Sequence, residues 1–380
     1  MSRMRQGARN DEPRRILHLI DSWGPGGAET VFTELVGRLS PERWTSLAVV
    51  PREGWVAKTL RKNGIQPILI PVRGSFNVRY LRGLIGAIRE FDIDLVHAHL
   101  FGASTYGGLA GRMCGVPVVS TLHGEPDLPS DDWKRRLRYA LIRRGSRRMV
   151  LVSASLRKRF HATGSYPRER STVIHNGIDL DIFGPGDGTG FRQELGVGKD
   201  HLLIGAVGNF RSAKAFDVFV EAAGRLAPKD VRFRFVIVGQ HDRTILPALK
   251  RRQAELGLGD RIMFPGFCSE IPDVFRALDV FVCSSWSEGF SLATVQAMAS
   301  GVPVVATRSG GPEEIILHGR DGVLVAPGSP DEIADAVMRL VTEPAWSSQL
   351  VEGAKERATE AFSIDRMIAD YESLYEEVLR

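Results

Sequence analysis

The feature that most constrains this chain is a series of short apolar runs, rich in β-branched residues, that recur at intervals long enough for a helix. In the first half they occupy residues 15–21, 46–51, 67–72, 94–100, 117–124, 148–154 and 172–177. In the second half they occupy residues 202–208, 234–239, 261–266, 279–285, 303–311 and 322–327. Apolar strands separated by amphipathic helices are typical of parallel sheets covered by helices on both faces. Two such series predict two Rossmann-like, doubly wound α/β domains.

The domain boundaries follow from the composition between these series. We expect an N-terminal domain over residues 13–183 and a C-terminal domain over residues 184–360, with a hinge in the Gly-, Pro- and Asp-rich stretch 179–190. Residues 361–380 have a helical apolar pattern and precede no strand, so we expect a helix that crosses back onto the first domain. Residues 1–12 are predicted to be a disordered tail.

The composition is that of an ordinary globular protein. The chain has 380 residues, of which 43% are hydrophobic and 25% charged. No stretch reaches 18 consecutive apolar residues, so no transmembrane helix is predicted. The apolar run near the N-terminus is too short for a signal peptide. We therefore expect a cytoplasmic protein.

Charge is distributed unevenly along the chain. Residues 1–183 hold 29 Lys and Arg against 17 Asp and Glu, whereas the remainder holds 21 against 28. The most basic segment, residues 131–148, can begin at Asp131 or Asp132 and has apolar residues at helical spacing, including Trp133 and Leu137. Such a helix can lie on an anionic membrane surface, at the inner face of the membrane. The alternative is a solvated helix whose apolar stripe packs on its own domain.

Polar residues that follow the predicted strands are the candidates for a ligand site, because open α/β sheets bind ligands at the carboxyl ends of their strands. The first such segment is GPGGAET, residues 24–30, in which Gly26 and Gly27 precede a helix. Glycines there let backbone amides approach a phosphate or a sugar closely. The spacing is not Gly-x-Gly-x-x-Gly, so a dinucleotide site is not favoured. The alternative is a tight turn with packing glycines.

A second segment, AVGNFRSAK, places two cations after a strand of the second series, Arg211 and Lys214. Two cations at a strand–helix crevice suit a diphosphate, whose charge needs partners that remain protonated. Asn209 and Gly239, which also follow strands, are further predicted substrate contacts. The alternative is a pair of solvated surface cations.

A third segment, SEGFSLATVQAMASG, has the strand–turn–helix form of an anion site. The amides that follow Gly289 lie at the predicted helix start and can donate to phosphate oxygens; they belong to Phe290, Ser291 and Leu292. Glu288 is expected to accept from sugar hydroxyls, because a diphosphate repels a carboxylate. Gln296 lies eight residues later and can accept from a ribose or sugar hydroxyl. The alternative is a helix cap with an exposed Gln.

Three histidines end two strands of the first series. His97 and His99 alternate onto one sheet face without a carboxylate at ligand spacing, so we expect structural hydrogen bonds rather than a metal. His123, which precedes Gly124 in a turn, is the better candidate for a catalytic residue.

In this order, the motifs TLHG, VIHNGID, GNFRSAKAFD, VIVG, SEGFSLATVQAMASGVPVV and GGPEEII are similar to those of family 4 retaining glycosyltransferases of the GT-B fold. With GGAE and the C-terminal helix, the resemblance covers residues 14–378. It implies two domains that face each other across a cleft. It also implies transfer of a sugar from a nucleoside diphosphate donor, such as a UDP- or GDP-sugar, to an acceptor hydroxyl with retention. Such enzymes build polysaccharides, lipopolysaccharides and glycolipids.

The resemblance also assigns roles. Arg211 and Lys214 correspond to a diphosphate clamp, Glu288 to a contact with the donor sugar, and Gln296 to the second Glu that holds the ribose. His123 resembles the histidine that contacts the transferred sugar. Gly26 and Gly27 are expected on the acceptor and phosphate side.

Three positions depart from the family pattern. Gln296 replaces a Glu, and we expect this to weaken donor binding by about 1 kcal/mol. Ala215 stands where Gly usually follows Lys, so the helix entry lacks glycine's freedom. Asn209 stands where the family has Arg, and Arg211 follows two positions later.

We therefore expect a metal-independent glycosyltransferase with no cofactor beyond its nucleotide-sugar co-substrate. Its other expected partners are a lipid-linked or saccharide acceptor and an anionic membrane surface, and no nucleic acid. Two alternatives stay open: a nucleotide-sugar 2-epimerase of the same architecture, and a non-catalytic nucleotide-sugar-binding subunit, which Gln296 makes more plausible.

Overall fold

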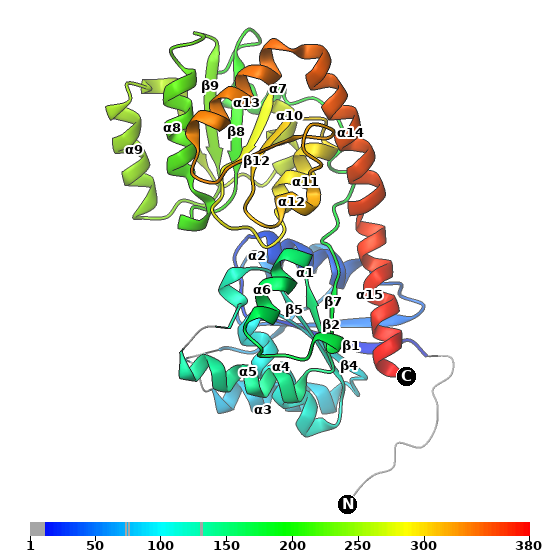
Figure 1. The fold of residues 1–380 in the computed structure, drawn as a ribbon. Coiled ribbons are helices and arrows are strands. Elements are labelled where there is room, and N and C mark those ends of the chain that lie inside the picture. Colours follow the sequence, from blue (N-terminus) through cyan, green and yellow to red (C-terminus); the bar gives the residue numbers. More distant parts are fainter. Residues whose placement is uncertain (1–11, 73, 75–76, 130–131) are drawn as a thin grey trace, which may run out of the picture.

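The computed structural model describes residues 12–72, 74, 77–129 and 132–380, which form two α/β domains. In Figure 1 the C-terminal domain lies above the N-terminal domain, and the last two helices run along one side of both. The predicted tail falls outside the described residues except for Glu12, and so does Asp131. No helix within these ranges is long and apolar enough to cross a membrane.

The N-terminal domain contains a parallel sheet of seven strands in the order β3-β2-β1-β4-β5-β6-β7. Its strands are β1 (Arg14–Ile20), β2 (Trp44–Val50), β3 (Ile68–Leu69), β4 (Leu95–His99), β5 (Val118–Leu122), β6 (Arg148–Leu151) and β7 (Ser171–Val173). Its helices are α1 (Gly27–Arg38), α2 (Trp55–Lys62), α3 (Val78–Glu90), α4 (Leu100–Cys114), α5 (Trp133–Gly145) and α6 (Ala154–Ala162).

The C-terminal domain contains a parallel sheet of six strands in the order β10-β9-β8-β11-β12-β13. Its strands are β8 (Leu202–Val207), β9 (Phe233–Val238), β10 (Ile262–Gly266), β11 (Val280–Cys283), β12 (Val304–Thr307) and β13 (Val323–Val325). Its helices are α7 (Thr189–Glu194), α8 (Phe216–Leu226), α9 (Ile245–Glu255), α10 (Ile271–Ala277), α11 (Leu292–Ala299), α12 (Pro312–Ile315), α13 (Pro330–Thr342) and α14 (Pro344–Phe362), and the chain ends with α15 (Ile364–Leu379).

These two parallel sheets confirm the predicted fold class. Several strands are shorter than their apolar runs, among them β3, which has two residues, and β7, which stops at Val173. β7 is an edge strand, and the chain leaves it to enter the other domain, so Ile174 to Gly177 do not continue the ladder.

The chain passes between the domains twice, and the two passages are hydrogen-bonded to each other. The amide of Ile178 donates to the carbonyl of Phe362 at 2.9 Å, and the amide of Ile364 donates to the carbonyl of Ile178 at 2.8 Å. A Cβ on Gly177 would lie 2.5 Å from the carbonyl oxygen of Ser363, so only glycine allows this approach. The passage thus lies just before the predicted hinge.

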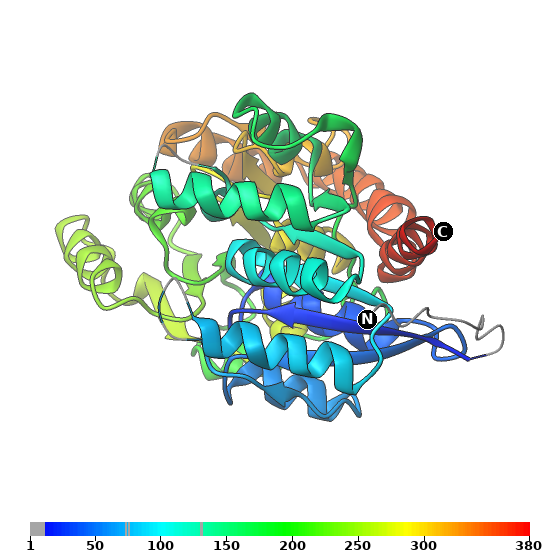
Figure 2. The same cartoon turned by 90° about the horizontal axis from the view of Figure 1, so that it is seen from below.

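After this crossing, α15 packs on the N-terminal sheet (Figure 1, in red), and the view from below in Figure 2 shows it beside that domain. Its apolar side chains share a core with those of α1 and with Ile16, Leu95 and Val119 of the strands. The opposite face of the sheet packs on α3 and α4. Residues of even number on β1 and of odd number on β4 and β5 therefore face α1 and α15.

Both sheets reverse their strand order between the first strand and the fourth, β1 next to β4 and β8 next to β11. Helices depart to opposite faces at such a point, which leaves room beyond the carboxyl ends of the strands for a ligand. The segments that follow β1, β8 and β11 carry most of the predicted site residues.

Candidate active site

Lys214 and Glu288 form an ion pair at the switch point of the C-terminal sheet. The Nζ atom of Lys214 lies 2.7 Å from Oε1 of Glu288, whose side chain is only 9% exposed. The hydroxyl of Ser285 donates to the same carboxylate oxygen at 2.6 Å. Burial by itself lowers the pKa of Lys214, but the neighbouring Glu288 carboxylate outweighs it and raises the pKa above its ordinary value. Lys214 therefore carries a fixed positive charge at this sheet edge.

Helix α11 begins three residues after Gly289 with a strained backbone. Ser291 has a φ of 79°, which places a residue with a side chain in the left-handed region. The amides of Phe290, Ser291 and Leu292 have no hydrogen-bond acceptor among the described residues. The ring of Phe290 is buried and stacks on His175 at 5.6 Å, so only its backbone is available to a ligand. The start of α11 thus offers unpaired donors beside Lys214.

Two glycines allow the strand ends beside Lys214 to approach each other. Gly239 has a φ of 157°, and a Cβ there would lie 1.9 Å from the carbonyl oxygen of Gly208. A Cβ on Gly208 would in turn lie 3.1 Å from Cε of Lys214. Gly239 therefore positions the loop that carries Lys214. Ala215 has the left-handed φ of 49°, as expected for a position where the family has Gly.

Backbone contacts join the two domains at the site. A Cβ on Gly289 would lie 2.0 Å from the carbonyl oxygen of His123, across the domain boundary. The side-chain amide of Asn209 donates to the carbonyl of Pro25 at 2.7 Å and accepts from the amide of Gln240 at 3.2 Å. The structure thus places Asn209, a predicted substrate contact, as a bridge between the domains.

Gly26 and Gly27 lie at the start of α1, next to this bridge. A Cβ on Gly26 would lie 2.3 Å from Oε2 of Glu29, whereas one on Gly27 would have no neighbour within 4 Å. Glu29 is buried and accepts a short hydrogen bond from the hydroxyl of Ser22. The carboxylate of Glu29 would have to move to admit a Cβ at Gly26, whereas Gly27 leaves open space beside the first turn of α1.

His123 follows β5, and its neighbours hold it in place. Its Nε2 lies 3.0 Å from Nδ1 of His99, and its backbone amide donates to Asp127 at 2.8 Å. Its Nδ1 is buried without a hydrogen-bond partner among the described residues. Burial lowers the pKa of His123 to about 3, so the ring is neutral at physiological pH. His123 can therefore hydrogen-bond a substrate but does not supply a cation.

The side chains of Arg211 and Gln296 make no hydrogen bond or ion pair with the part of the chain that the structure describes. Arg211 is exposed, and no acidic partner of its guanidinium lies within the described ranges. Gln296 is 8% exposed on α11, and its side-chain amide likewise has no hydrogen bond to a described residue. Because α11 begins at Leu292, Gln296 lies about one turn into the helix. The alternative drawn from the sequence was a helix cap with an exposed Gln. Because Gln296 is buried, that alternative is wrong.

Glu314, which follows β12 and belongs to the GGPEEII motif, was given no role from the sequence, yet it joins the domains. Its carboxylate accepts from the amides of Ala154 and Ser155 at 2.8 and 2.6 Å, at the start of α6, and lies 3.1 Å from Nε2 of His175. Burial raises the pKa of Glu314, but the hydrogen bonds from His175 and the two amides outweigh it and lower the pKa overall. A sequence predicts an acidic residue at a helix N-terminus only when the residue and the helix lie in the same segment, and Glu314 and α6 do not.

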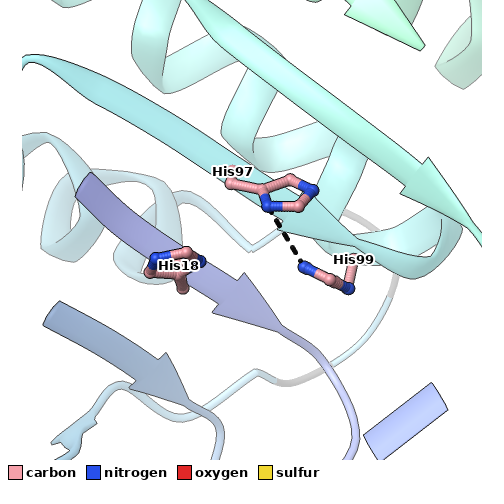
Figure 3. A group of neighbouring side chains, drawn as sticks. All are labelled: His18, His97 and His99. Carbon is pink, nitrogen blue, oxygen red and sulfur yellow. Dashed lines mark hydrogen bonds between the residues drawn. The ribbon is translucent and has the colours of Figure 1, made fainter. Parts of the chain in front are cut away.

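Among the residues that the structure describes, one group has donor atoms close enough together for a metal. The nearest ring nitrogens of His18, His97 and His99 lie within 4.8 Å of one another, and all three rings are buried (Figure 3). His97 already uses both nitrogens, with Tyr375 at 2.7 Å and Thr121 at 2.8 Å. A metal would have to break one of these bonds. The arrangement therefore fits the expected structural hydrogen bonds. That the enzyme needs no metal stays a prediction.

His18 was missed because it lies within an apolar run. In the parallel register it is paired with His97, so both face α1 and α15. Counting alternate residues of β1 and β4 together would have revealed this pairing.

Family models match most of the chain. One, described as Glycosyltransferase Family 4, matches residues 25–182, and a second, described as Glycosyl transferases group 1, matches residues 201–343. The D-inositol 3-phosphate glycosyltransferase 1 of Catenulispora acidiphila is 30% identical over 326 residues, which cover 80% of this chain and 77% of that protein. The D-inositol 3-phosphate glycosyltransferase of Frankia alni is 32% identical over 289 residues, 70% of each chain. The chain belongs to glycosyltransferase family 4.

Solved structures of glycosyltransferases share the fold of this family 4 enzyme. Anabaena HepE in complex with UDP and glucose has a TM-score of 0.86 and 23% identity, with 95% of this chain and 99% of that chain covered. A glycosyltransferase from Rickettsia africae has a TM-score of 0.87 and 21% identity, with 97% and 99% covered. These likenesses confirm the predicted GT-B architecture of the family 4 glycosyltransferase.

Proposed function

We propose that this family 4 glycosyltransferase transfers a sugar from a nucleoside diphosphate sugar to an acceptor hydroxyl with retention at the anomeric carbon. The observation that carries the proposal is the buried Lys214–Glu288 pair beside the unpaired amides that open α11. The amides and Lys214 stabilise the charge that develops on the departing diphosphate. Arg211, which is exposed nearby, adds a second cation. The UDP and UDP-glucose bound to HepE support a donor of this class.

In the proposed reaction, the bond between the anomeric carbon and the phosphate oxygen breaks, and a bond to the acceptor oxygen forms on the same face. The acceptor proton passes to the departing phosphate oxygen. Glu288 already binds Lys214 and Ser285, so it is suited to hold sugar hydroxyls rather than to attack the anomeric carbon. The positive charge at the site comes from side chains and amides, which is why we propose a reaction without a metal.

Neutral His123 lies across the domain boundary from Gly289 and is proposed to contact the transferred sugar. Closure of the boundary excludes water, which limits hydrolysis of the donor. Gln296 keeps an acceptor oxygen for the ribose but lacks the charge of a Glu.

In this proposal the acceptor binds to the N-terminal domain, which is basic. The relatives include D-inositol 3-phosphate glycosyltransferases and an N-acetyl-alpha-D-glucosaminyl L-malate synthase from Bacillus anthracis, whose names contain anionic compounds. The excess of 29 Lys and Arg over 17 Asp and Glu in residues 1–183 favours an anionic acceptor here too. Lipid-linked and saccharide acceptors with phosphate or carboxylate groups both meet this condition.

Helix α5 is the proposed membrane contact. Trp133 is 66% exposed and Leu137 is 46% exposed, one turn apart on the same helix face. Exposed basic residues flank them, namely Lys134, Arg136, Arg143 and Arg144. The buried residues of α5 are Tyr139 and Ile142, so the face that bears Trp133 is not used for packing on the domain. A cytoplasmic enzyme with this surface can act at the inner face of the membrane.

One assay tests the reaction. The purified protein is incubated with UDP-, GDP- and dTDP-sugars, with and without membranes, and nucleotide release is followed. Release that requires an acceptor supports transfer. An isomerised donor without acceptor supports the epimerase, and nucleotide binding without turnover supports the non-catalytic subunit.

A further inference from the structure

Trp23 presents an exposed indole ring beyond the carboxyl end of β1. The residue is 42% exposed and lies in the segment between β1 and α1. The guanidinium carbon of Arg52, in the segment between β2 and α2, lies 3.7 Å from the centre of this ring. At this distance the guanidinium stacks on one face of the indole. No second ring or cation of a described residue stacks on Trp23, so the other face is available to a ligand.

A close main-chain contact holds the two segments together. The amide of Val56 donates to the carbonyl of Trp23 at 3.2 Å. A Cβ on Gly54 would lie 2.5 Å from that carbonyl oxygen and 3.1 Å from Cβ of Trp23, so glycine allows this approach. The base of the indole side chain is therefore fixed before a ligand arrives. A ligand that binds to a pre-positioned ring loses less free energy to ordering.

Arg52 carries a charge that no neighbour neutralises. Its side chain is exposed, and its guanidinium has no hydrogen bond or ion pair within the described ranges. The adjacent carboxylate, that of Glu53, is bound by Arg61 at 2.6 Å instead. A guanidinium stacked on a ring keeps its N–H groups at the edge of the stack, where two of them can donate to one phosphate or carboxylate. Arg52 is therefore oriented by Trp23 and keeps its donors free.

This pair lies at the boundary between the domains. The carbonyl of Pro25, which closely follows Trp23 in the chain, accepts from the side-chain amide of Asn209 of the C-terminal domain at 2.7 Å. In Figure 1, α2 lies on the side of the N-terminal domain that faces the C-terminal domain. Cβ atoms on Gly24 and Gly27 would meet nothing within 4 Å, so the segment that carries Trp23 is bordered by open space. A ligand at this sheet edge lies where doubly wound domains bind their substrates.

The chemistry of the pair selects a sugar with an acidic group. The C–H groups on one face of a sugar ring are apolar and slightly positive, which suits the negative face of an indole ring. The indole N–H of Trp23 donates to no residue that the structure describes, so it can donate to a sugar hydroxyl. Arg52 supplies the paired donors that a phosphate or a carboxylate requires.

We propose that Trp23 and Arg52 form an acceptor subsite that binds a sugar ring bearing a phosphate or carboxylate group. The sugar ring covers the free face of Trp23, and the acidic group pairs with Arg52. That the bound sugar belongs to the acceptor rests on the proposed function, whereas its binding does not. A lipid-linked sugar and a free saccharide both offer this chemistry.

The test is a titration of protein labelled with ¹⁵N-tryptophan, followed through its six indole N–H signals. Trp23→Phe lacks one signal and so assigns it. The probes are D-glucose 6-phosphate and D-glucuronate, with D-glucose and inorganic phosphate as their separate parts. Each charged sugar is expected to move the Trp23 signal at a lower concentration than D-glucose or phosphate does. The signal of Trp133, which is 66% exposed on α5, is expected to stay in place.

Two variants separate the paired charge from the general charge of the surface. Arg52→Gln keeps a planar end group that can stack on Trp23 but removes the cation, so the affinity for both charged sugars is expected to fall about tenfold or more. Lys58→Gln is the matched control, because it removes an equal charge from an exposed position of α2. It is expected to change these affinities by less than about twofold, since salt screens charges that do not touch the ligand.

Three results would overturn the proposal. The first is a Trp23 signal that neither charged sugar moves at concentrations up to about 50 mM. The second is movement of the Trp286 signal in place of the Trp23 signal, because the amide of Trp286 is bound to the carbonyl of Ala213, beside Lys214 on the donor side. The third is a loss of affinity in Lys58→Gln as large as that in Arg52→Gln.

Vesicles distinguish the two sources of the sugar. Sedimentation of the wild-type enzyme and of Arg52→Gln is compared on phosphatidylcholine vesicles that contain either glucuronosyl diacylglycerol or phosphatidylglycerol. A loss confined to the glycolipid assigns a lipid-linked sugar, and equal sedimentation of the two proteins on both lipids assigns a free saccharide. An equal loss on both lipids would make Arg52 a general membrane contact and would contradict the proposal.

The nucleotide-release assay separates this subsite from the proposed function. A response of Trp23 to the charged sugars without sugar transfer would refute the proposed function and leave the subsite in place. Sugar transfer without any response of Trp23 would refute the subsite and leave the proposed function in place.

Discussion

Gly289 lies where the main chains of the two domains approach closely, and replacing it with Ala tests whether that fit is needed for turnover. A Cβ at this position would lie 2.0 Å from the carbonyl oxygen of His123 and 2.9 Å from Cα of Gly124. Both are main-chain atoms, so no side-chain rotation relieves the overlap. The φ of Gly289 is outside the left-handed region, and the effect of Ala is therefore due to this contact alone.

The size of the effect follows from the geometry. An ordinary contact begins at 3.4 Å, so the two domains must separate locally by about 1.4 Å to admit the methyl group. A displacement of about 1 Å at a reacting centre lowers turnover by about 10²-fold. We expect Gly289→Ala to lose at least this factor in nucleotide release from the donor, while circular dichroism shows that both domains remain folded.

Gly86→Ala provides the matched control. Gly86 lies within α3, and a Cβ there would have no heavy atom within 4 Å. Ala is expected to leave turnover unchanged and to stabilise the protein by about 0.5–1 kcal/mol. Turnover of Gly289→Ala within threefold of wild type would refute the reasoning, because the reacting conformation would then keep the domains farther apart here than the structure does.

Three further substitutions test the site. Lys214→Ala should lower turnover by about 10²-fold or more. Adding Glu288→Gln should restore thermal stability, because it removes the unpaired carboxylate, but it should not restore turnover. Near-normal kinetics of Lys214→Ala would show that Lys214 does not belong to the diphosphate site. Gln296→Glu should tighten donor binding about fivefold in calorimetry, and abolished binding would show that this position serves another purpose. Glu314→Gln should lower the free energy of unfolding by about 1–2 kcal/mol at pH 7. The pKa of Glu314 is lowered in the folded state, so this contribution is present above the unfolded pKa and is lost as pH falls through the folded value. The difference between wild type and variant should therefore shrink in thermal melts as the pH is lowered past the ordinary pKa of a glutamate, and a constant difference would contradict the assigned role of the carboxylate.

Much of the site was accessible from the sequence because its residues lie within single segments. Lys214, Glu288 and the amides after Gly289 each follow one strand directly, and the carboxyl ends of parallel strands meet at one sheet edge. Ala215 illustrates the same point, since the resemblance marks its position as one that usually holds Gly, and the structure gives it a left-handed φ.

Residues whose role depends on a distant segment could not be assigned in this way. Asn209 contacts Pro25, 184 positions away, and Glu314 contacts Ala154 and Ser155, about 160 positions away. No periodicity within one segment encodes how two domains are oriented, because their contacts form only after each has folded.

The sequence by itself determined the two parallel sheets, the family and the local motifs, because strand burial and turn chemistry are properties of short segments. Only the tertiary structure decided that Gly289 meets His123, and that a histidine of an apolar strand lies beside two others under α15. These contacts depend on strand register and on the return of the last helix across the domain boundary. Both are set by packing over the whole chain, which no single stretch of residues specifies.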